Sequence, residues 1–269
     1  MNTIKILTGA FFITAALVSC DKAELSTTET ILPGADRAFV KVAFLSPGSP
    51  ATVIKVNDTK VNGTTLFTST GTNFTTALFP NSLFPSTLGF PDYISVPAAS
   101  TFKFVVPNTG TQNDSVVLVN TKFDLTSGKY HSVTVADTGI NRTAFVTQDE
   151  FLPQVDSLLS VRLINGMVGS NLNLIRIDSN SAADVVRDTL ARNIPYKGSS
   201  GFIAVKTFTA RSFIRVRITT TNGVSVGTAQ TPPQALATGS RRSITYYAGG
   251  FLNGTLNFAP GLSPHVTNQ

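Results

Sequence analysis

Short runs in which apolar and polar residues alternate fill the chain from about residue 38 onward. In the first run, Val40, Val42 and Phe44 fall on one side of the predicted strand and Lys41 falls on the other. A period of two over about four to eight residues is typical of a half-buried β-strand. The segment 182–190 is compatible with either a helical turn or a strand. Turn residues separate the runs, among them Pro47-Gly48, Ser127-Gly128 and Asn222-Gly223.

The order of these runs repeats once along the chain. Residues 40–44 match 161–165, Tyr93-Ile-Ser-Val matches Phe202-Ile-Ala-Val, and residues 125–134 match 236–245. The repeat predicts an all-β protein with two tandem antiparallel immunoglobulin-like β-sandwich domains of roughly 100 residues each. The expected parts are a first domain at residues 36–148, a junction at 149–158, a second domain at 159–258 and a C-terminal tail at 259–269.

The loop after the first predicted strand resembles a known family. Ser46-Pro47-Gly48-Ser49-Pro50-Ala51 is similar to the Ser-Pro-Asp-Ala-Pro loop of domain of unknown function 4397, and the run Val53–Asp58 after it also resembles that family. Gly48 and Ser49 replace the usual Asp-Ala, and the matching segment 165–171 has lost both prolines. The resemblance implies an extracytoplasmic β-sandwich with no established activity, and it adds no site residues.

An apolar run precedes the alternating body. Lys5 is followed by Ile6–Val18, which is shorter than the ~20 apolar residues that span a bilayer but typical of a signal peptide. It ends in Leu17-Val18-Ser19-Cys20, which resembles the lipobox of bacterial lipoproteins. The resemblance implies that residues 1–19 are removed by cleavage between Ser19 and Cys20, and that Cys20 becomes lipidated. The polar residues up to position 35 then form a flexible tether.

The predicted lipid determines the expected cellular location of the protein. A lipobox cysteine carries two or more acyl chains by family resemblance, and two chains anchor a protein stably where one does not. We therefore expect a lipid-anchored protein in the cell envelope of a Gram-negative bacterium, in the outer membrane, with the periplasmic and surface faces both left open. The membrane is a partner through Cys20.

Composition and motifs offer little catalytic chemistry. Cys20 is the single cysteine, which excludes an internal disulfide and a zinc site built from cysteines. Gly198-Ser-Ser-Gly201 lacks the spacing of a nucleophile elbow. Of the two histidines, His131 is expected at a solvent-facing strand end and His265 in the tail, and Asp149-Glu150 is expected in a solvated turn. We therefore expect a non-enzymatic protein without a cofactor or metal.

Charge is distributed unevenly between the two halves. Residues 20–150 hold nine basic and eleven acidic residues, whereas residues 151–269 hold eleven basic and four acidic residues. Such asymmetry indicates an anionic partner for the second half. Nucleic acid is not expected at this address, so the candidates are an anionic envelope glycan or another envelope protein.

The basic residues are densest in one predicted strand. With a period of two, one face of this strand carries an arginine stripe made of Arg211, Phe213, Arg215 and Arg217. Arginine binds planar anions through paired donors and stacks on aromatic rings, so the stripe is a candidate anion-binding site. A solvated sandwich face is the alternative interpretation.

A looser pattern concerns modification and leads to the predicted function. Ser115, Ser157 and Thr189 each follow an aspartate and precede an apolar residue, which is similar to an O-glycosylation acceptor of some Gram-negative bacteria. The sequence predicts a non-enzymatic binding, adhesion or structural module of the envelope. The alternative is a glycan-processing enzyme, or a glycan-binding accessory protein, with a site at the domain junction.

Overall fold

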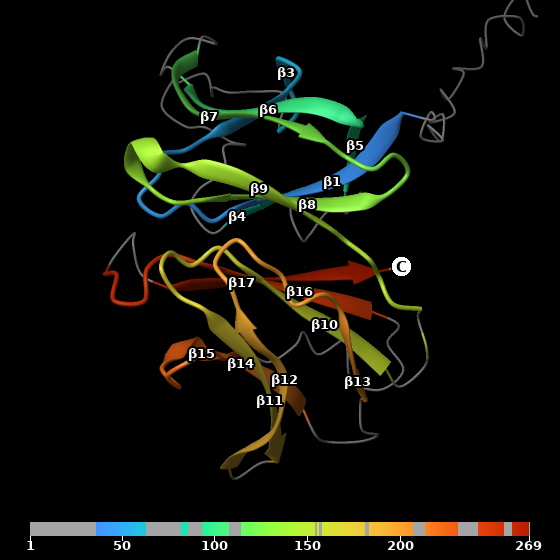
Figure 1. The fold of residues 1–269 in the computed structure, drawn as a ribbon, viewed down its shortest axis with the longest axis vertical. Coiled ribbons are helices and arrows are strands. Elements are labelled where there is room, and N and C mark those ends of the chain that lie inside the picture. Colours follow the sequence, from blue (N-terminus) through green and yellow to red (C-terminus); the bar gives the residue numbers. More distant parts are fainter. Residues whose placement is uncertain are drawn as a thin grey trace, which may run out of the picture. The chain divides into compact units, whose positions relative to one another are not determined.

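The alternating pattern produces strands β1 to β17 and one 3-10 turn, η1 (Gly139–Asn141), in the computed structural model (Figure 1). The structure describes residues 36–62, 82–85, 93–107, 114–153, 155, 158–180, 183–206, 213–230, 242–255 and 260–268. In that part of the chain no helix has the length and apolarity needed to cross a membrane. The predicted signal peptide, Ser19, Cys20 and the tether lie outside the described residues.

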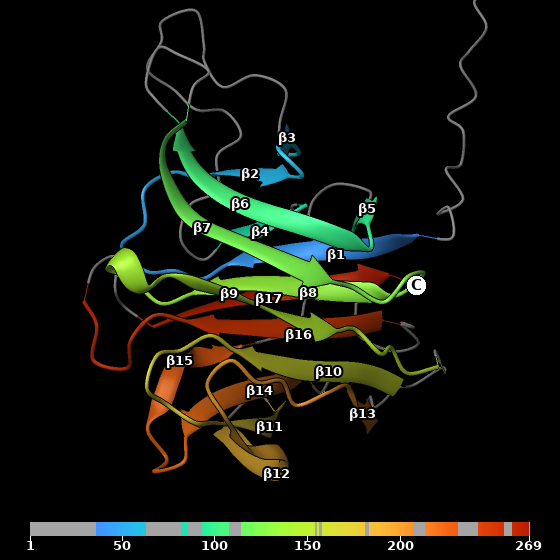
Figure 2. The ribbon, with the colours of Figure 1, turned by 45° about the horizontal axis from the view of Figure 1, so that its top comes forward.

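Two sheets form the first sandwich. Inner sheet 1 has the strand order β4-β1-β8-β9, and β5 also pairs with β1. Outer sheet 1 has the order β3-β2-β6-β7, and Figure 2 shows β6 and β7 as its long curved strands. The bounds are β1 (Arg37–Phe44), β2 (Val53–Val56), β3 (Thr59–Lys60), β4 (Ser82–Phe84), β5 (Ile94–Pro97), β6 (Ala99–Pro107), β7 (Asp114–Asp124), β8 (Tyr130–Ala136) and β9 (Thr143–Gln148).

Two further sheets form the second sandwich. Inner sheet 2 has the order β13-β10-β16-β17, and outer sheet 2 has the order β12-β11-β14-β15. The bounds are β10 (Leu158–Asn165), β11 (Leu172–Asn180), β12 (Ala183–Ile194), β13 (Ile203–Lys206), β14 (Phe213–Thr220), β15 (Ser225–Gln230), β16 (Arg242–Gly249) and β17 (Gly261–Asn268). The two sandwiches belong to one compact unit of residues 35–269.

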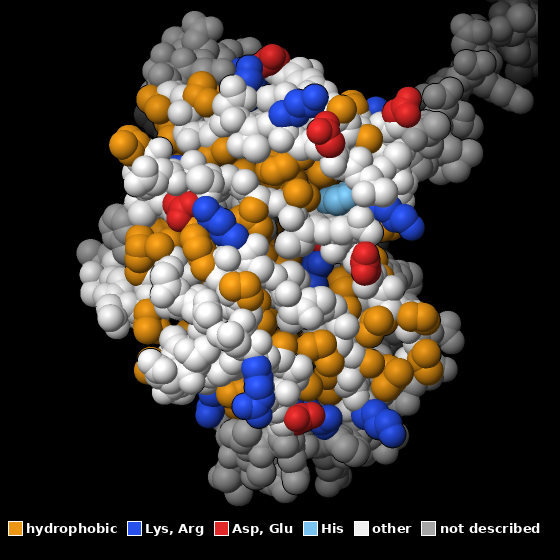
Figure 3. All heavy atoms as spheres, in the orientation of Figure 1, with side chains coloured by type: hydrophobic (Ala, Val, Ile, Leu, Met, Phe, Trp, Pro, Cys, Tyr) orange, Lys and Arg blue, Asp and Glu red, His pale blue; other side chains and the backbone are white. Residues whose placement is uncertain are grey.

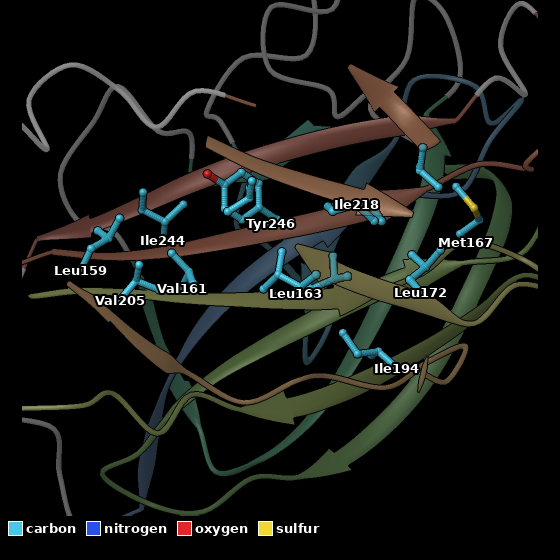
Figure 4. Packing of buried hydrophobic residues seen from close by; sticks show 14 residues of the cluster. Leu159, Val161, Leu163, Met167, Leu172, Ile194, Val205, Ile218, Ile244 and Tyr246 are labelled. Atoms are coloured by element: carbon cyan, nitrogen blue, oxygen red, sulfur yellow. The ribbon is translucent and has the colours of Figure 1, made fainter. Parts of the chain in front are cut away.

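Each sandwich encloses its own hydrophobic core, as period-two alternation requires. Val40, Val42 and Phe44 of β1 pack with Phe102 and Phe104 of β6 in the first core. The second core is built in the same way from inner and outer sheet 2, as Figure 4 shows. It contains Leu159, Val161 and Leu163 of β10, Leu172 of β11, Ile218 of β14 and Ile244 and Tyr246 of β16.

The predicted fold class is confirmed, with one difference in strand direction. Both sandwiches are all-β and mostly antiparallel, but β1 pairs with β8, and β10 with β16, in parallel. The repeat also has a structural counterpart, because Val40 pairs with Ile94 and the matching Val161 pairs with Ile203.

The structure corrects the expected C-terminal tail and assigns the segment 182–190, for which the sequence left two interpretations open. Residues 261–268, expected as part of a tail, form β17, which pairs with β16 in continuous register. The prediction missed this strand because Pro264 lies inside it, and proline is tolerated at a sheet edge, where no ladder partner needs its missing N–H. Residues 183–194 form a strand, β12, which decides between the two interpretations of segment 182–190.

Candidate functional site

The inner sheets of the two sandwiches contact each other through faces that carry many polar side chains. A small apolar cluster joins them, with Ala43 and Leu45 from the first sandwich and Ile164 and Tyr247 from the second. Polar side chains at most 2% exposed occupy the rest of these faces. They include Lys41, Ser132 and Thr134 on inner sheet 1 and Arg162, Thr245 and His265 on inner sheet 2.

An ion pair lies at the centre of this polar layer. Arg162 Nη1 lies 2.6 Å from Asp149 Oδ1, with side chains 1% and 0% exposed. Arg162 also donates through Nη2 to Ser132 Oγ at 3.0 Å and through Nε to Thr245 Oγ1 at 2.9 Å. The other carboxylate oxygen, Asp149 Oδ2, accepts from Ser132 Oγ at 2.9 Å and from the Tyr93 hydroxyl at 2.8 Å. The pair therefore has polar partners from both sandwiches.

Electrostatics keeps Arg162 charged despite its burial. Burial alone would lower the pKa of Arg162, but the Asp149 carboxylate outweighs this and raises that pKa above its ordinary value. Burial and the negative charge of Asp149 raise the pKa of Tyr93 well above its ordinary value, so its hydroxyl stays protonated and donates. Asp149 was expected in a solvated turn; this prediction was wrong because the residue after β9 turns in toward Arg162.

Aromatic rings gather beside this ion pair. We call Phe39, Tyr93, Tyr130, Phe151 and Phe202 the junction aromatic cluster. Phe39 stacks on Tyr130 with ring centroids 4.8 Å apart, and Tyr93 meets Tyr130 edge-on at 5.0 Å. Phe151, in the segment that connects the sandwiches, lies 5.5 Å from Tyr130 and 5.0 Å from Phe202. The cluster therefore joins rings from both sandwiches and from their connection.

The cluster is partly open to solvent. Tyr130 is 38% exposed, Tyr93 is 7% exposed, and the three phenylalanines are half-buried. Exposed Lys129, Gln148 and Glu150 are chain neighbours of cluster residues or of Asp149, and Gln148 Nε2 donates to Glu150 Oε1 at 3.1 Å. Aromatic rings together with a few hydrogen-bonding side chains are also the residue types that line small-ligand sites. Such a surface can pack on the C–H face of a sugar ring and hydrogen-bond to its hydroxyls.

The far end of β8 carries a second contact between the sandwiches. Asp137, directly after β8, accepts from the Tyr196 hydroxyl and lies 3.0 Å from Lys197 Nζ. Burial would raise the pKa of Asp137, but hydrogen bonds from Thr143, Tyr196 and Lys197 outweigh it and lower that pKa. Asp137 and Lys197 both have φ of 63°, a left-handed conformation that costs about 1–3 kcal/mol in a non-glycine residue. This contact fixes the junction at the end opposite the aromatic cluster.

The loop that resembles domain of unknown function 4397 is fastened beside Asp137. Arg142 Nε donates to Ser49 Oγ at 2.8 Å and to Ser46 Oγ at 3.1 Å. Ser46 Oγ in turn donates to the Asp137 carbonyl at 2.6 Å. These bonds give Ser46 and Ser49 a structural role.

Neither histidine lies where the sequence suggests. His131 is 4% exposed, accepts from the Thr126 N–H through Nε2 at 3.3 Å, and has its pKa lowered by burial. The expected solvent-facing strand end was wrong because the ring is buried, with Nε2 beside the Thr126 N–H and Nδ1 3.2 Å from the Lys129 carbonyl oxygen. His265 is fully buried in β17, and within the described residues neither ring nitrogen has a hydrogen-bond partner. Burial, and then the charges of Lys41 and Arg162, lower the pKa of His265 to about 3.

The arginine stripe falls on β14. Val216 and Ile218 are buried in the second core, as the alternation predicts, and Arg217 is half-buried. Arg211 lies outside the described residues, as do the side chains of Phe213 and Arg215. The stripe belongs to outer sheet 2, whereas the junction aromatic cluster lies at the inner sheets, so the structure does not join them into one site.

The modification candidates are scattered along the chain. Ser115 is in β7 and half-buried Thr189 is in β12, whereas Ser157 and Cys20 lie outside the described residues. Across the described ranges, no group of three His, Cys, Asp or Glu side chains is placed to hold a metal ion. On the face shown in Figure 3, Lys and Arg side chains lie beside Asp or Glu at several places, between hydrophobic and uncharged polar side chains.

The sequence suggested the domain junction as an alternative place for a site, but it did not identify the residues that the structure brings together there. Its members come from separate segments, and Arg162, Asp149 and Phe151 drew no attention as a group. One signal was present: Tyr93 and Phe202 are matched by the internal repeat, and both rings contact Phe151. An aromatic residue kept at the same place in both copies was the available indication of a shared site.

Comparisons with known proteins add a general likeness of fold. No known protein family and no curated protein matches the chain. The fimbrial anchor protein Mfa2 from Porphyromonas gingivalis is similar at 11% identity and a TM-score of 0.28, over 87% of this chain and 98% of that one. The tip fimbrial protein Mfa3 from the same organism is similar at 9% identity and a TM-score of 0.26, over 87% and 99%.

A third similar structure is a carbohydrate-binding module. It is CBMbc, of family CBM26, from Eubacterium rectale Amy13K in complex with maltoheptaose, at 9% identity and a TM-score of 0.24, over 86% of this chain and 97% of that one. Scores this low carry no argument for a shared function. The site must therefore be interpreted from its own chemistry.

Proposed function

We propose that this chain is a non-enzymatic, lipid-anchored binding module of a Gram-negative cell envelope, and that it binds an envelope glycan at the junction aromatic cluster. The observation that carries the proposal is the convergence of four partly exposed rings, Phe39, Tyr130, Phe151 and Phe202, from both sandwiches and their connection. An aromatic surface of this kind suits binding, because the rings supply apolar contact area and the Tyr130 hydroxyl can form a hydrogen bond.

The chemistry of the cluster favours a sugar as the ligand. A pyranose ring presents C–H groups on its faces and hydroxyls around its edge. The faces suit the ring of Tyr130, which is 38% exposed, and the hydroxyls suit the exposed polar groups of Gln148 and Glu150. Aromatic side chains with few charges and several hydrogen-bonding groups can satisfy both.

The packing of the junction supports the same proposal. A binding surface shared by two domains keeps its shape only if the domains are held together. Here the Arg162–Asp149 ion pair and the Asp137–Lys197 contact hold the two sandwiches at different ends of β8. The cluster is thereby organised before a ligand arrives, which reduces the entropy lost on binding.

The predicted lipoprotein signal supports the address. The apolar run and the lipobox that ends at Cys20 would leave the mature chain attached to a membrane, and we propose the outer membrane as its place. A glycan-binding module there would meet the polysaccharides of the envelope.

Affinity electrophoresis of the full chain tests the proposed function. The gels contain soluble starch, a mixed-linkage β-glucan, a mannan or a purified envelope polysaccharide fraction. We expect at least one of these to retard the protein. Tyr130→Ala should weaken that retardation by about tenfold, because it removes one exposed ring.

The matched control is Ile140→Ala, which removes an apolar side chain that is 99% exposed and lies in η1, away from the cluster. It should leave the retardation unchanged. The proposal is contradicted if no glycan retards the parent chain, or if the Ile140 variant loses as much binding as the Tyr130 variant.

A further inference from the structure

The buried ion pair touches two aromatic residues that hold equivalent places in the two copies. Tyr93 precedes β5 and Phe202 precedes β13, and the sequence repeat matches them. The Tyr93 hydroxyl donates to Asp149 Oδ2 at 2.8 Å, and Arg162 Cζ lies 4.4 Å from the centroid of the Phe202 ring. Each member of the ion pair therefore holds one of the two equivalent rings.

Tyr93 and Phe202 differ in chemistry, and each suits the member of the ion pair that it contacts. Tyr93 carries a hydroxyl and faces the carboxylate, which needs a donor, whereas Phe202 lacks one and offers its ring face to the guanidinium. The face of an aromatic ring carries partial negative charge and attracts a cation. Exchanging the two residues would leave Asp149 with one donor fewer and set a hydroxyl beside Arg162.

Stability alone does not explain this pair. A fully buried ion pair is often no more stabilising than apolar residues of similar volume, because both charges lose their hydration. The side chains of Arg162 and Asp149 are 1% and 0% exposed, so both charges have lost their hydration. What a charged pair does better than an apolar one is to fix direction, since its hydrogen bonds to Tyr93, Ser132 and Thr245 depend on angle as well as distance.

We propose that Arg162 and Asp149 are positioning residues of the junction aromatic cluster: they hold the rings of Phe202 and Tyr93 against Phe151, so that the ligand meets a single ring arrangement. This inference rests on the proposed glycan binding, which it deepens. The two charges contact no ligand themselves, because they lie beneath the rings.

Replacing the pair by apolar residues separates positioning from folding. In the full chain, Arg162→Met with Asp149→Leu should retain the far-UV circular dichroism and a cooperative melt. The chain has five tyrosines and no tryptophan, so its near-UV band near 275 nm reports tyrosine packing, including that of Tyr93 and Tyr130. We expect this band to weaken and the affinity for the retarding glycan to fall by about tenfold.

A milder variant keeps the test decisive if the double variant fails to fold. Tyr93→Phe retains the ring and removes only its tie to Asp149, so affinity should fall while the fold persists. The control is Thr245→Val, which removes a hydrogen bond of Arg162 that does not involve the rings. It should leave the affinity within about twofold of the parent.

Two results would overturn the positioning role. One is a double variant in which both the tyrosine band and the affinity are unchanged. If the double variant does not fold, an unchanged affinity in Tyr93→Phe has the same meaning. The other is an equal loss of affinity in Tyr93→Phe and Thr245→Val. If the parent binds none of the four glycans, the proposed function fails, and the near-UV band of the double variant still decides the positioning role.

Discussion

Leu45 and Gly166 occupy equivalent positions in the two copies, and they meet at the junction. A Cβ built on Gly166 would lie 2.8 Å from Leu45 Cδ1 and 3.1 Å from the Ala248 carbonyl oxygen. The backbone N–H of Leu45 donates to the Val135 carbonyl of β8, and that of Gly166 to the Ala248 carbonyl of β16, so each bonds to the strand that runs parallel to the strand before it.

This contact predicts the effect of one added methyl group. Gly166→Ala should lower the free energy of unfolding by about 1–3 kcal/mol, because the new Cβ overpacks a site with no space for it. Chemical denaturation of the full chain measures the change. Leu45→Ala in the same chain removes the side chain that the methyl would meet, so the two substitutions together should cost less than the sum of their separate effects. Strict additivity would contradict the contact.

The strands and both cores could be predicted because period-two alternation records which face is buried. Val40, Val42 and Phe44 were assigned to one face of a strand, and all three are in the first core. The turns followed from glycine for a similar local reason: Gly128 and Gly223 have φ of 70° and 83°, which few other residues adopt readily.

The junction could not be predicted because alternation does not say what covers the second face of a strand. Lys41 was assigned to a face opposite the core, where solvent is the ordinary expectation for a charged residue, and Arg162 is its match in the second copy. The two inner sheets cover each other instead, and both residues are at most 1% exposed. The partner of Arg162 is Asp149, which lies thirteen residues earlier in the chain, directly after the edge strand β9 of the first sandwich. No local sequence spacing therefore connects the two residues.

Burial of His265 predicts a dependence of stability on pH. Its pKa falls from an ordinary 6.5 to about 3 in the folded chain. Between these values the unfolded chain binds more protons than the folded one, so the free energy of unfolding falls as the pH is lowered through that window. The loss is about 1.4 kcal/mol per pH unit, or roughly 2–3 kcal/mol between pH 6.5 and pH 4.5.

Denaturation of the full chain at pH 7 and pH 4.5 checks this expectation. His265→Leu should lose clearly less stability over that interval than the parent does. His131 also has a lowered pKa and remains in both proteins, so some dependence on pH persists in the variant. An identical dependence in the two proteins would mean that His265 takes up no proton on unfolding.

The lipobox predicts that membrane attachment depends on the thiol of Cys20. Cys20→Ser should give a chain without lipid that no longer fractionates with membranes, because no other cysteine exists to accept the acyl groups. Fractionation of expressing cells with a salt wash measures the distribution. Replacing Ser26 in the predicted tether with alanine is a suitable control and should leave the protein on the membrane. Retention of the Cys20 variant after the wash would refute the anchor.

The arginine stripe and the junction aromatic cluster predict different binding behaviour. If the stripe binds an acidic polysaccharide, retention on such a column should weaken steeply with salt, since exposed charges separated by more than ~8 Å are screened at physiological ionic strength. Arg215→Ala with Arg217→Ala should then reduce this retention while changing the free energy of unfolding by no more than about 0.5 kcal/mol. Tyr130→Ala should leave retention on the acidic column unchanged, because that ring is in the other sandwich.

The neutral glycans should show the opposite dependence, with binding lost in the Tyr130 variant and kept in the arginine variant. Equal retention of the parent and the arginine variant on the acidic column at every salt concentration would leave β14 as an ordinary solvated strand.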